Sequence, residues 1–358
     1  MAVELQISLC MIVKDEEAFL DASLKSSISL LCFDDIVIVD TGSTDKTKEI
    51  AHDNGVTVFS FDWCSDFSAA RNFAASKAVN DWILMLDADE TVLEADLSDL
   101  SSFISSANEN SVGSIKVVAH PDSLSSNISR LYNRKHHIWN GKIHEQLVPT
   151  GENKNEIVTV PITVIHYGYS PEVKKDKRKF ERNLYMLENS LVENPDDPYL
   201  LAQLGKCYYV NNEDLNKACD YFYKALSFES DFRLEYVYIT VLFYGYSLLN
   251  TEQYEKALIH INKYANHYAD TKAEFRFLMA HIYQNNGLFQ EAVECYESCI
   301  GIDMPDPEGI TSYLSYYNIG VILECVGMIE DAADMYRNCG DYKPAVLRLD
   351  NMTKRSCI

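Results

Sequence analysis

The chain has 358 residues, a length that favours two domains, and 47% of its residues are hydrophobic, which is enough material for two cores. Its formal net charge of -23 argues against a general nucleic-acid-binding protein, because phosphate backbones are bound by basic surfaces. The ten cysteines include no CxxC pair, and we recognise neither a signal peptide nor an apolar run of about 18 residues, so we expect a cytoplasmic protein without disulfides or a transmembrane segment.

Short apolar runs alternate with helical patterns along the first half of the chain. Strands are predicted at 7–13, 35–40, 56–61 and 82–90, and helices at 16–27, 44–55 and 66–79. Each strand is an almost continuous apolar run, which is typical of strands covered on both faces. Strands and helices alternating at this spacing indicate βαβ units. The first half is therefore predicted to be an α/β, Rossmann-like domain with a mostly parallel sheet.

From about residue 180 the pattern changes to helices that repeat every 34 to 40 residues or so. In each repeat a small residue is followed by an apolar residue and then, three positions later, by an alanine. The small residues are Gly205, Gly245, Ala280 and Gly320, the apolar residues are Leu215, Tyr254, Phe289 and Ile329, and the alanines are Ala218, Ala257, Ala292 and Ala332. This period is typical of tetratricopeptide helix hairpins, in which the small residues let paired helices approach closely. The second half is predicted to be an all-α, TPR-like repeat domain.

Two acidic residues, Asp87 and Asp89, follow the apolar segment WILML. Alternate side chains of an extended strand point the same way, so both carboxylates would lie on one side. Carboxylates this close repel each other unless a cation lies beside them, and Mg²⁺ or Mn²⁺ accepts such oxygen ligands. The alternative is an acidic turn that only ends the strand. Because ligands of open α/β sheets bind at the carboxyl ends of the strands, the position favours a metal site.

Asp40 ends another predicted strand and precedes the polar segment STDKT. Its carboxylate is placed to accept a hydrogen bond from a nucleotide base, whereas Ser43, Thr44 and Asp45 are better explained as helix caps. Arg71 lies in the early turns of the helix that leads into the acidic strand. Its guanidinium group could hold a diphosphate or form an ordinary surface salt bridge, and the sequence alone leaves both open.

The segments ISLCMIVKDEEAFL, VIVDTGSTDKT, FSAARNFA and WILMLDADE, in this order and spacing, resemble the family 2 glycosyltransferases of GT-A fold. The resemblance covers roughly residues 5–170, and Asp15-Glu16 replaces the usual Asn-Glu of the family. It implies a UDP-sugar donor (UDP-glucose or UDP-GlcNAc), a Mg²⁺ or Mn²⁺ ion and inversion of the anomeric carbon. By this resemblance, Val13, Asp15 and Glu16 would line the nucleotide pocket. Asp40 would contact the base, and Arg71 would lie near the base or a phosphate. Asp87 and Asp89 would form the metal-binding motif.

A second polar cluster follows in HHIWNGKIHEQLVPT (136–150) and VIHYGYSP (164–171). Inverting transfer requires a base that takes the proton of the acceptor, and a positive charge that stabilises the departing diphosphate. Glu145 is the candidate base, and His166 is the candidate third metal ligand beside the two aspartates. His144 is the alternative for either role. All three could instead be loop residues with ordinary hydrogen bonds.

The motif WNGKIHE followed by HYGY also resembles a subgroup of these transferases, the glycocin-type peptide glycosyltransferases, in which helical repeats follow the catalytic domain. This resemblance implies a peptide or protein acceptor that is modified on Cys, Ser or Thr. The repeats would offer a concave surface for the acceptor, or an interface for a homodimer.

We accordingly expect a GT-A domain at 1–172, a basic helical linker at 173–196 and TPR-like repeats at 197–350. The linker is either a solvated helix face or a contact for phosphates. Its basic residues are Lys174, Lys175, Lys177, Arg178 and Lys179.

Three other interpretations are open at this point. The acceptor could be a cell-envelope glycan or a lipid-linked sugar. The chain could be a repeat scaffold with an inactive transferase domain, although the retained Asp87, Asp89, Glu145 and His166 argue against this. A nucleotidyltransferase would normally carry a glycine-rich phosphate loop after the first strand, and MIVKDEE contains no glycine.

Overall fold

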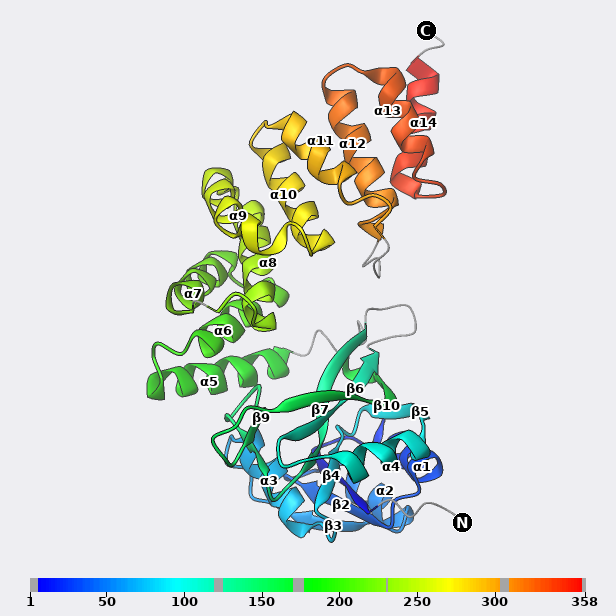
Figure 1. The fold of residues 1–358 in the computed structure, drawn as a ribbon, viewed down its shortest axis with the longest axis vertical. Helices are drawn as coiled ribbons and strands as arrows, with labels where there is room; N and C mark the ends of the chain where they lie inside the picture. Colours follow the sequence, from blue (N-terminus) through cyan, green and yellow to red (C-terminus); the bar gives the residue numbers. More distant parts are fainter. Residues whose placement is uncertain (1–5, 119–124, 170–176, 230, 303–308, 356–358) are drawn as a thin grey trace. The chain divides into compact units, whose positions relative to one another are not determined.

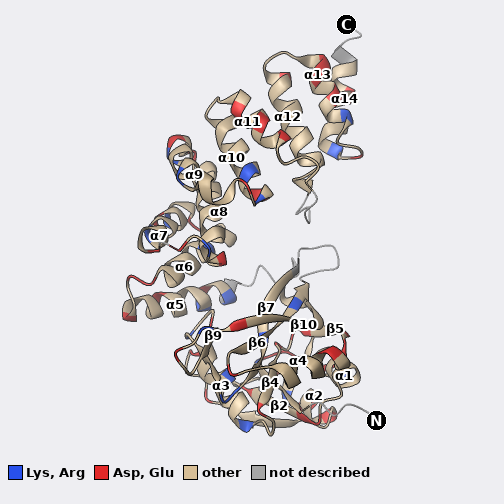
Figure 2. Ribbon diagram, viewed as in Figure 1, with Lys and Arg blue, Asp and Glu red and all other residues tan. Residues whose placement is uncertain are grey.

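The computed structural model describes residues 6–118, 125–169, 177–229, 231–302 and 309–355 (Figure 1). The chain forms two compact units, Met1–Met186 and Leu187–Ile358, and the boundary falls within helix α5 (Lys177–Glu193). The domain bounds expected from the sequence stay predictions, and Lys174 and Lys175 of the expected linker lie outside the described residues. Acidic and basic residues are spread along both units (Figure 2).

The first unit is built, within its described part, on an eight-stranded sheet of order β3-β2-β1-β4-β7-β6-β10-β5, with a separate pair of β8 and β9. The sheet strands are β1 (Ile7–Val13), β2 (Asp35–Asp40), β3 (Thr57–Ser60), β4 (Trp82–Met85), β5 (Glu90–Ala95), β6 (Ser111–Val118), β7 (Ser125–Asn133) and β10 (Glu156–His166). The pair is β8 (His137–Asn140) and β9 (Gln146–Pro149). The helices are α1 (Leu20–Leu31), α2 (Thr47–Asp53), α3 (Phe67–Lys77) and α4 (Leu97–Ser106), and a 3₁₀ turn, η1 (Tyr167–Tyr169), follows β10.

The sheet is mixed, with a parallel half and a half that contains antiparallel strands. Strands β3, β2, β1 and β4 are parallel, as the strand–helix alternation predicts. Strand β7 runs antiparallel to both of its neighbours, and β5 runs antiparallel to β10. The unit is thus an α/β domain of the expected GT-A type. Its parallel half contains the four strands that the alternating sequence pattern predicts.

Strand β1 shows why its sequence has no polar alternation. Leu9 and Met11 pack into a core that includes residues of α1, whereas Cys10 packs into a second core that includes Ala74 and Ala75 of α3. Both faces of the strand are therefore covered, so its residues are apolar except for the buried Ser8, whose hydroxyl donates to Asp35.

The carboxyl ends of β1, β2 and β4 meet at one edge of the sheet, because these strands are parallel neighbours. Two elements next to this edge differ from the sequence prediction. Strand β4 ends at Met85 and the chain then turns, so the alternation argument does not apply to Asp87 and Asp89. Helix α1 begins at Leu20 instead of residue 16, because the backbone before it is held in a loop by side chains that follow β2.

The second unit consists of helix hairpins, as the repeat pattern predicts. Its helices after α5 are α6 (Pro198–Val210), α7 (Leu215–Phe228), α8 (Glu235–Asn250), α9 (Tyr254–Tyr268), α10 (Ala273–Asn285), α11 (Phe289–Glu297), α12 (Tyr313–Cys325), α13 (Ile329–Arg337) and α14 (Lys343–Arg355). The four apolar residues of the pattern begin α7, α9, α11 and α13, and the four alanines are fully buried.

The glycines of the repeats allow close helix contacts. A Cβ atom at Gly205 would lie 2.5 Å from the ring of Phe222, and one at Gly320 would lie 2.6 Å from the ring of Tyr336. Both distances are shorter than any van der Waals contact, so only glycine lets these helices pack as they do. Within the described ranges, none of the helices is both long and apolar enough to cross a membrane.

Candidate active site

The loop after β1 is fastened to the segment after β2 by a set of short hydrogen bonds. Asp15 accepts a hydrogen bond from the Thr44 amide at 2.7 Å, and its own amide donates to Ser43 Oγ at 3.0 Å. The Glu16 amide donates to Thr47 Oγ1 at 2.7 Å. Asp15 has a φ of 55°, a left-handed conformation that these bonds hold in place. The STDKT segment therefore shapes the loop that carries Asp15 and Glu16. The expected helix caps are wrong for Ser43 and Thr44: the N-cap residue of α2 is Lys46, and only Asp45 accepts an amide of the first turn, that of Thr47 at 2.9 Å.

Asp40 is buried where β2 ends, beside Val13 of β1. Its carboxylate accepts hydrogen bonds from the amides of Ser43 (3.1 Å) and Gly42 (3.2 Å), and Lys48 Nζ lies 3.5 Å away. Burial raises the pKa of Asp40, but these hydrogen bonds and Lys48 outweigh it and hold the pKa below its usual value. Its carboxylate thus fixes the turn after β2, and the contact of Asp40 with a nucleotide base stays a prediction.

The segment Asp87–Glu90 forms a tight turn that its own side chain closes. The Glu90 amide donates to the carbonyl of Asp87 at 3.0 Å, and the Asp87 amide donates to Glu90 Oε2 at 2.9 Å. The two aspartates have different partners: Asp87 faces two arginines, whereas Asp89 Oδ1 lies 3.2 Å from His166 Nε2. A side chain at Gly168 would collide with the Asp89 carboxylate, which explains the glycine of the HYGY motif.

Arg71 joins the acidic turn to Glu145. Its Nη2 donates to Asp87 Oδ1 at 2.8 Å, and its Nε donates to Glu145 Oε1 at 2.6 Å. Burial lowers the pKa of Arg71, but the charges of Asp87 and Glu145 outweigh it and raise the pKa. Arg71 Nη1 is also buried and has no hydrogen-bond partner among the described residues. This nitrogen is a spare donor next to the acidic turn.

The loop between β8 and β9 carries Glu145 to this place because it is docked on α3. Asn72 exchanges two hydrogen bonds with the backbone of Trp139, at 2.8 and 2.9 Å, and the Phe67 amide donates to the carbonyl of Lys142. The Trp139 ring lies 5.2 Å from the Arg71 guanidinium. His144 is exposed with a φ of 52°, so the structure brings Glu145 into the cluster and leaves His144 at the surface.

Arg130 of β7 is one of two residues that the sequence interpretation missed, and the other is Glu90 of the acidic turn. Its Nη2 donates to Asp87 Oδ2 at 2.6 Å and to Glu90 Oε1 at 2.8 Å. Burial raises the pKa of Asp87, but Arg130 and Arg71 outweigh it and hold that pKa well below its usual value. The available signal was an arginine inside the strand sequence NISRLYN, because a buried charge is costly unless it is paired.

His166 and Glu16 complete the cluster from the ends of β10 and β1. Burial lowers the pKa of His166, but its hydrogen bond with Asp89 and the nearby carboxylates outweigh this effect and raise the pKa. Burial, together with the charges of Asp89 and Asp87, raises the pKa of Glu16 to about 7. The cluster thus contains five carboxyl groups beside two guanidinium groups and one imidazole, and burial also raises the pKa of Glu90.

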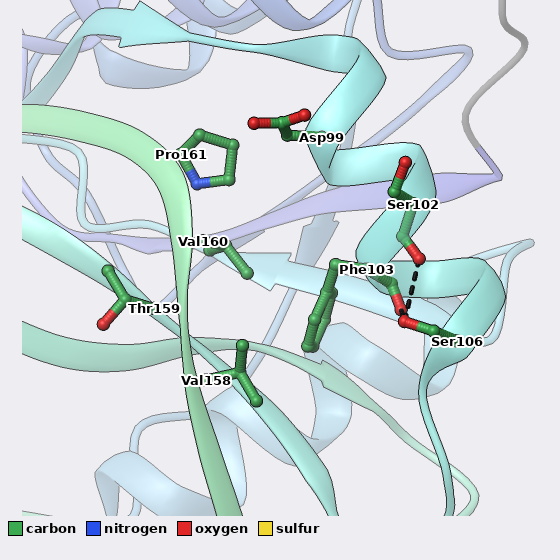
Figure 3. Close-up of a pocket in the computed structure, with 8 residues that line it drawn as sticks. All are labelled: Asp99, Ser102, Phe103, Ser106, Val158, Thr159, Val160 and Pro161. Atoms are coloured by element: carbon green, nitrogen blue, oxygen red, sulfur yellow. Dashed lines mark hydrogen bonds between the residues drawn. The ribbon is translucent and has the colours of Figure 1, made fainter.

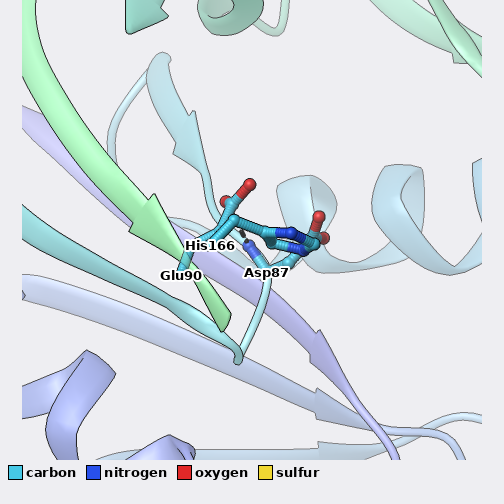
Figure 4. Close-up of side chains that lie close together, drawn as sticks. All are labelled: Asp87, Glu90 and His166. Atoms are coloured by element: carbon cyan, nitrogen blue, oxygen red, sulfur yellow. Dashed lines mark hydrogen bonds between the residues drawn. The ribbon is translucent and has the colours of Figure 1, made fainter. Parts of the chain in front are cut away.

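Three of these side chains are arranged so that they could hold a metal ion (Figure 4). Asp87, Glu90 and His166 each offer one ligand atom, and the three atoms lie within 4.8 Å of one another. Two carboxylates and one imidazole are a donor set that Mn²⁺ and Mg²⁺ accept. Asp89, which the sequence predicted as a ligand, is not one of these three side chains, and its Oδ1 lies 3.2 Å from His166 Nε2.

A groove of about 490 Å³ lies elsewhere in this unit, between α4 and β10 (Figure 3). It is lined by Asp99, Ser102, Phe103, Ser106, Val158, Thr159, Val160 and Pro161. None of the candidate residues lines it, so the candidate site is the cluster at the carboxyl edge of the parallel strands.

Comparison with known proteins gives independent information on both units. Residues 8–166 match the model of glycosyl transferase family 2, and residues 273–303 match the model of the tetratricopeptide repeat. A TPR repeat-containing protein of Synechococcus elongatus is 35% identical over 220 residues, which are 56% of this chain and 51% of that protein. The SPbeta prophage-derived glycosyltransferase SunS of Bacillus subtilis is 26% identical over 201 residues, 54% of this chain and 47% of SunS. The chain spans about half the length of these curated relatives.

Solved structures match each part of the chain at low similarity. MamA aligns with 52% of this chain and 98% of its own, with 18% identity and a TM-score of 0.39. Glucosyl-3-phosphoglycerate synthase from Mycobacterium tuberculosis, in complex with Mn²⁺ and UDP-glucose, aligns with 32% of this chain and 44% of its own, with 19% identity and a TM-score of 0.26. The family models and the fold point to the same division: residues 8–166 match glycosyl transferase family 2, and the helix hairpins that follow include a tetratricopeptide repeat match at 273–303.

Proposed function

We propose that the protein is an inverting, metal-dependent glycosyltransferase that moves a hexose from a UDP-sugar to a Cys, Ser or Thr side chain of a peptide or protein. The observation that supports this most strongly is the convergence of Asp87, Glu145 and His166, which are far apart in the sequence, around Arg71 at the strand edge. The family match of residues 8–166 supports the same reaction class.

The metal site is proposed on Asp87, Asp89 and His166, with Glu90 as an additional oxygen donor. The ligand atoms of Asp87, Glu90 and His166 lie within 4.8 Å of one another, and Asp89 Oδ1 lies 3.2 Å from His166 Nε2, so these oxygen ligands suit a divalent cation. A bound Mg²⁺ or Mn²⁺ would stabilise the negative charge that develops on the departing diphosphate. The spare Nη1 donor of Arg71 suits a phosphate oxygen of the same group.

The nucleotide would lie along the loops after β1 and β2. Val13 and Asp40 stand side by side at the strand ends, and Asp15 and Glu16 follow on the fastened loop. Because the pKa of Glu16 is raised to about 7, part of its population is protonated near neutral pH and can donate a hydrogen bond to a base carbonyl. We assign these four residues to nucleotide binding.

Glu145 is the proposed base. It would take the proton of the acceptor thiol or hydroxyl while the acceptor atom bonds to the anomeric carbon, and the bond from that carbon to the diphosphate oxygen breaks. UDP then leaves with the electron pair of the broken bond, and the sugar is attached with inverted configuration. Arg71 holds the Glu145 carboxylate at 2.6 Å and so orients it beside the acidic turn.

The acceptor is proposed to be a peptide or protein because the second unit consists of tetratricopeptide repeats. Stacked helix hairpins of this kind form extended concave surfaces that bind polypeptide segments. The similarity to a TPR repeat-containing protein and to the glycosyltransferase SunS suits the same combination. Self-association through the repeats to form a homodimer is the other use of such a surface.

The test is UDP release from UDP-glucose and from UDP-GlcNAc, with Mn²⁺ present and a pool of Cys-, Ser- and Thr-containing peptides as acceptors. We expect Glu145→Gln to lower the rate on the order of 10²- to 10⁴-fold, because the amide cannot take the proton. Glu152→Gln, an exposed and matched change in the β9–β10 loop, should leave the rate unchanged. No release by the wild type from either donor, or equal rates for wild type and Glu145→Gln, would overturn the proposal.

A further inference from the structure

Arg130 lies in the buried middle of a central strand, where charged side chains are rare. The residue lies in the middle of β7, between β4 and β6, and its side chain is only 8% exposed. A guanidinium group buried to this extent is strongly destabilising unless its charge is paired and its donors are bonded. The two carboxylates that it meets, Asp87 and Glu90, both belong to the acidic turn.

The backbone is adapted to bring this side chain to the turn. The register of β6 and β7 shifts between Gly113 and Ser114, which pair with Leu131 and Ser129, so Arg130 is the extra residue of a β-bulge. Bulges redirect a side chain out of the regular alternation and are frequent beside active sites. The strands are also unusually close here, because a Cβ atom at Gly113 would lie 2.9 Å from Leu131 Cβ.

The turn itself depends on Glu90, which Arg130 holds. Glu90 accepts three hydrogen bonds: its Oε2 from the Asp87 amide, its Oε1 from Arg130 Nη2, and its backbone carbonyl from the Ser23 hydroxyl at 2.6 Å. One nitrogen atom of Arg130 therefore connects the side chain that closes the turn with the side chain of Asp87.

We propose that Arg130 is a positioning residue for the metal turn: by bridging Asp87 and Glu90 from a β-bulge, it holds their carboxylates in the arrangement that binds a divalent cation. The inference rests on the proposed function, which places the metal at this turn. Groups that orient metal ligands typically change metal affinity by 10- to 100-fold when they are removed.

The opposite result follows if Arg130 acts only as a charge. Removing a positive charge next to two metal ligands would, on electrostatic grounds alone, strengthen the binding of a divalent cation. The direction of the change in Mn²⁺ affinity therefore separates positioning from a charge effect. A lysine keeps the charge but replaces the rigid, planar guanidinium group with a flexible ammonium group, so it should hold the two carboxylates less firmly.

The experiment is a calorimetric titration of the full chain with Mn²⁺ alone, for wild type, Arg130→Met, Arg130→Lys and Arg134→Met. Arg134 is the matched control, because it follows β7 and donates to the carbonyls of Ala75 and Ala78 without touching the acidic turn. We expect Arg130→Met to weaken Mn²⁺ binding on the order of 10- to 100-fold, Arg130→Lys to weaken it by a smaller factor, and Arg134→Met to leave it unchanged.

Mn²⁺ affinity that is unchanged or increased in Arg130→Met, measured below its unfolding temperature, would overturn the positioning role. If Arg130→Met does not fold, Arg130→Lys decides the question: weakened Mn²⁺ binding supports positioning, and wild-type affinity contradicts it. Failure of the wild type to bind Mn²⁺ would instead contradict the proposed function on which the inference rests.

Discussion

Single buried charges set the chemistry of the candidate site. Arg71 and Arg130 are both buried, and each is stabilised by two carboxylates at distances from 2.6 to 2.8 Å. The two arginines also lower the pKa of Asp87, so its carboxyl group is ionised at neutral pH and can bind a metal. Glu16 lies near the same carboxylates, and burial together with the charges of Asp89 and Asp87 raises its pKa to about 7. The arginines thus lower the pKa of Asp87, whereas burial raises the pKa of Glu16 and of Glu90.

Part of this network could be predicted from single residues and part could not. Asp87, Asp89 and Glu145 belong to short sequence motifs, and His166 ends an apolar strand, so the sequence identified all four as candidate site residues. Arg130 was not, because its role depends on a bulge that places β7 beside the turn. The roles of all these residues in catalysis stay predictions until they are measured.

A buried histidine of the repeats leads to a pH prediction at the same scale. His260 Nε2 lies 2.8 Å from the Val241 carbonyl, and burial lowers the pKa of His260 to about 4. The unfolded pKa is about 6.5, so between pH 6.5 and 4 the unfolded chain binds more protons than the folded one. The second unit should therefore lose stability as pH falls through this window, by up to about 3 kcal/mol from this residue.

Urea denaturation between pH 7.5 and 4.5, followed by circular dichroism, measures this loss. His260→Gln removes the titrating group and should flatten the pH dependence, whereas the exposed His52→Gln should keep the wild-type profile. Parallel pH profiles for wild type and His260→Gln would show that His260 is not responsible. His281, whose pKa burial also lowers to about 4, would then be the next group to substitute.

At the scale of elements, local patterns and long-range contacts differ in how far the sequence predicts them. The helix hairpins were predictable because a small residue and an alanine mark each repeat, and both features depend on near neighbours in the chain. Strands β1 and β2 were found with their observed ends for the same reason. The turn after β4 was not, because Asp87 and Asp89 are held by residues of α3, β7 and β10. Propensity gives no information on such distant partners.

The close packing of α12 and α13 gives a prediction for this scale. A methyl group at Gly320 would lie 2.6 Å from the Tyr336 ring, which is fully buried and hydrogen-bonded through its hydroxyl to Glu324 at 2.8 Å. We expect Gly320→Ala to lower the free energy of unfolding by roughly 1–3 kcal/mol, because the ring or the helix must shift.

The measurement is urea unfolding of the whole chain, with Gly151→Ala as the control. Gly151 lies in the β9–β10 loop and has open space around its Cβ position, so the same chemical change should have little effect there. Equal unfolding curves for Gly320→Ala and wild type would mean that α12 and α13 do not pack as closely as described.

At the scale of the whole molecule, the chain divides its tasks between two units. The candidate active site lies within the first unit, and the repeats make up the second. The change from alternating strands and helices to repeating helices predicted this division from the sequence. The identity of the acceptor is a property of the whole protein, and the proposal of a peptide acceptor rests on the presence of both units in one chain.

The central claim is that the cluster at the strand edge binds a nucleoside diphosphate together with a divalent metal. A calorimetric titration of the full chain with UDP, with and without Mn²⁺, tests this claim most directly. The titration should include Asp89→Asn and, as a matched control, Asp99→Asn on α4, which lines the distant groove. We predict UDP binding that requires Mn²⁺, that is lost in Asp89→Asn and that is retained in Asp99→Asn. UDP binding that is indifferent to both Mn²⁺ and Asp89→Asn, or no binding of UDP under any condition, would contradict it.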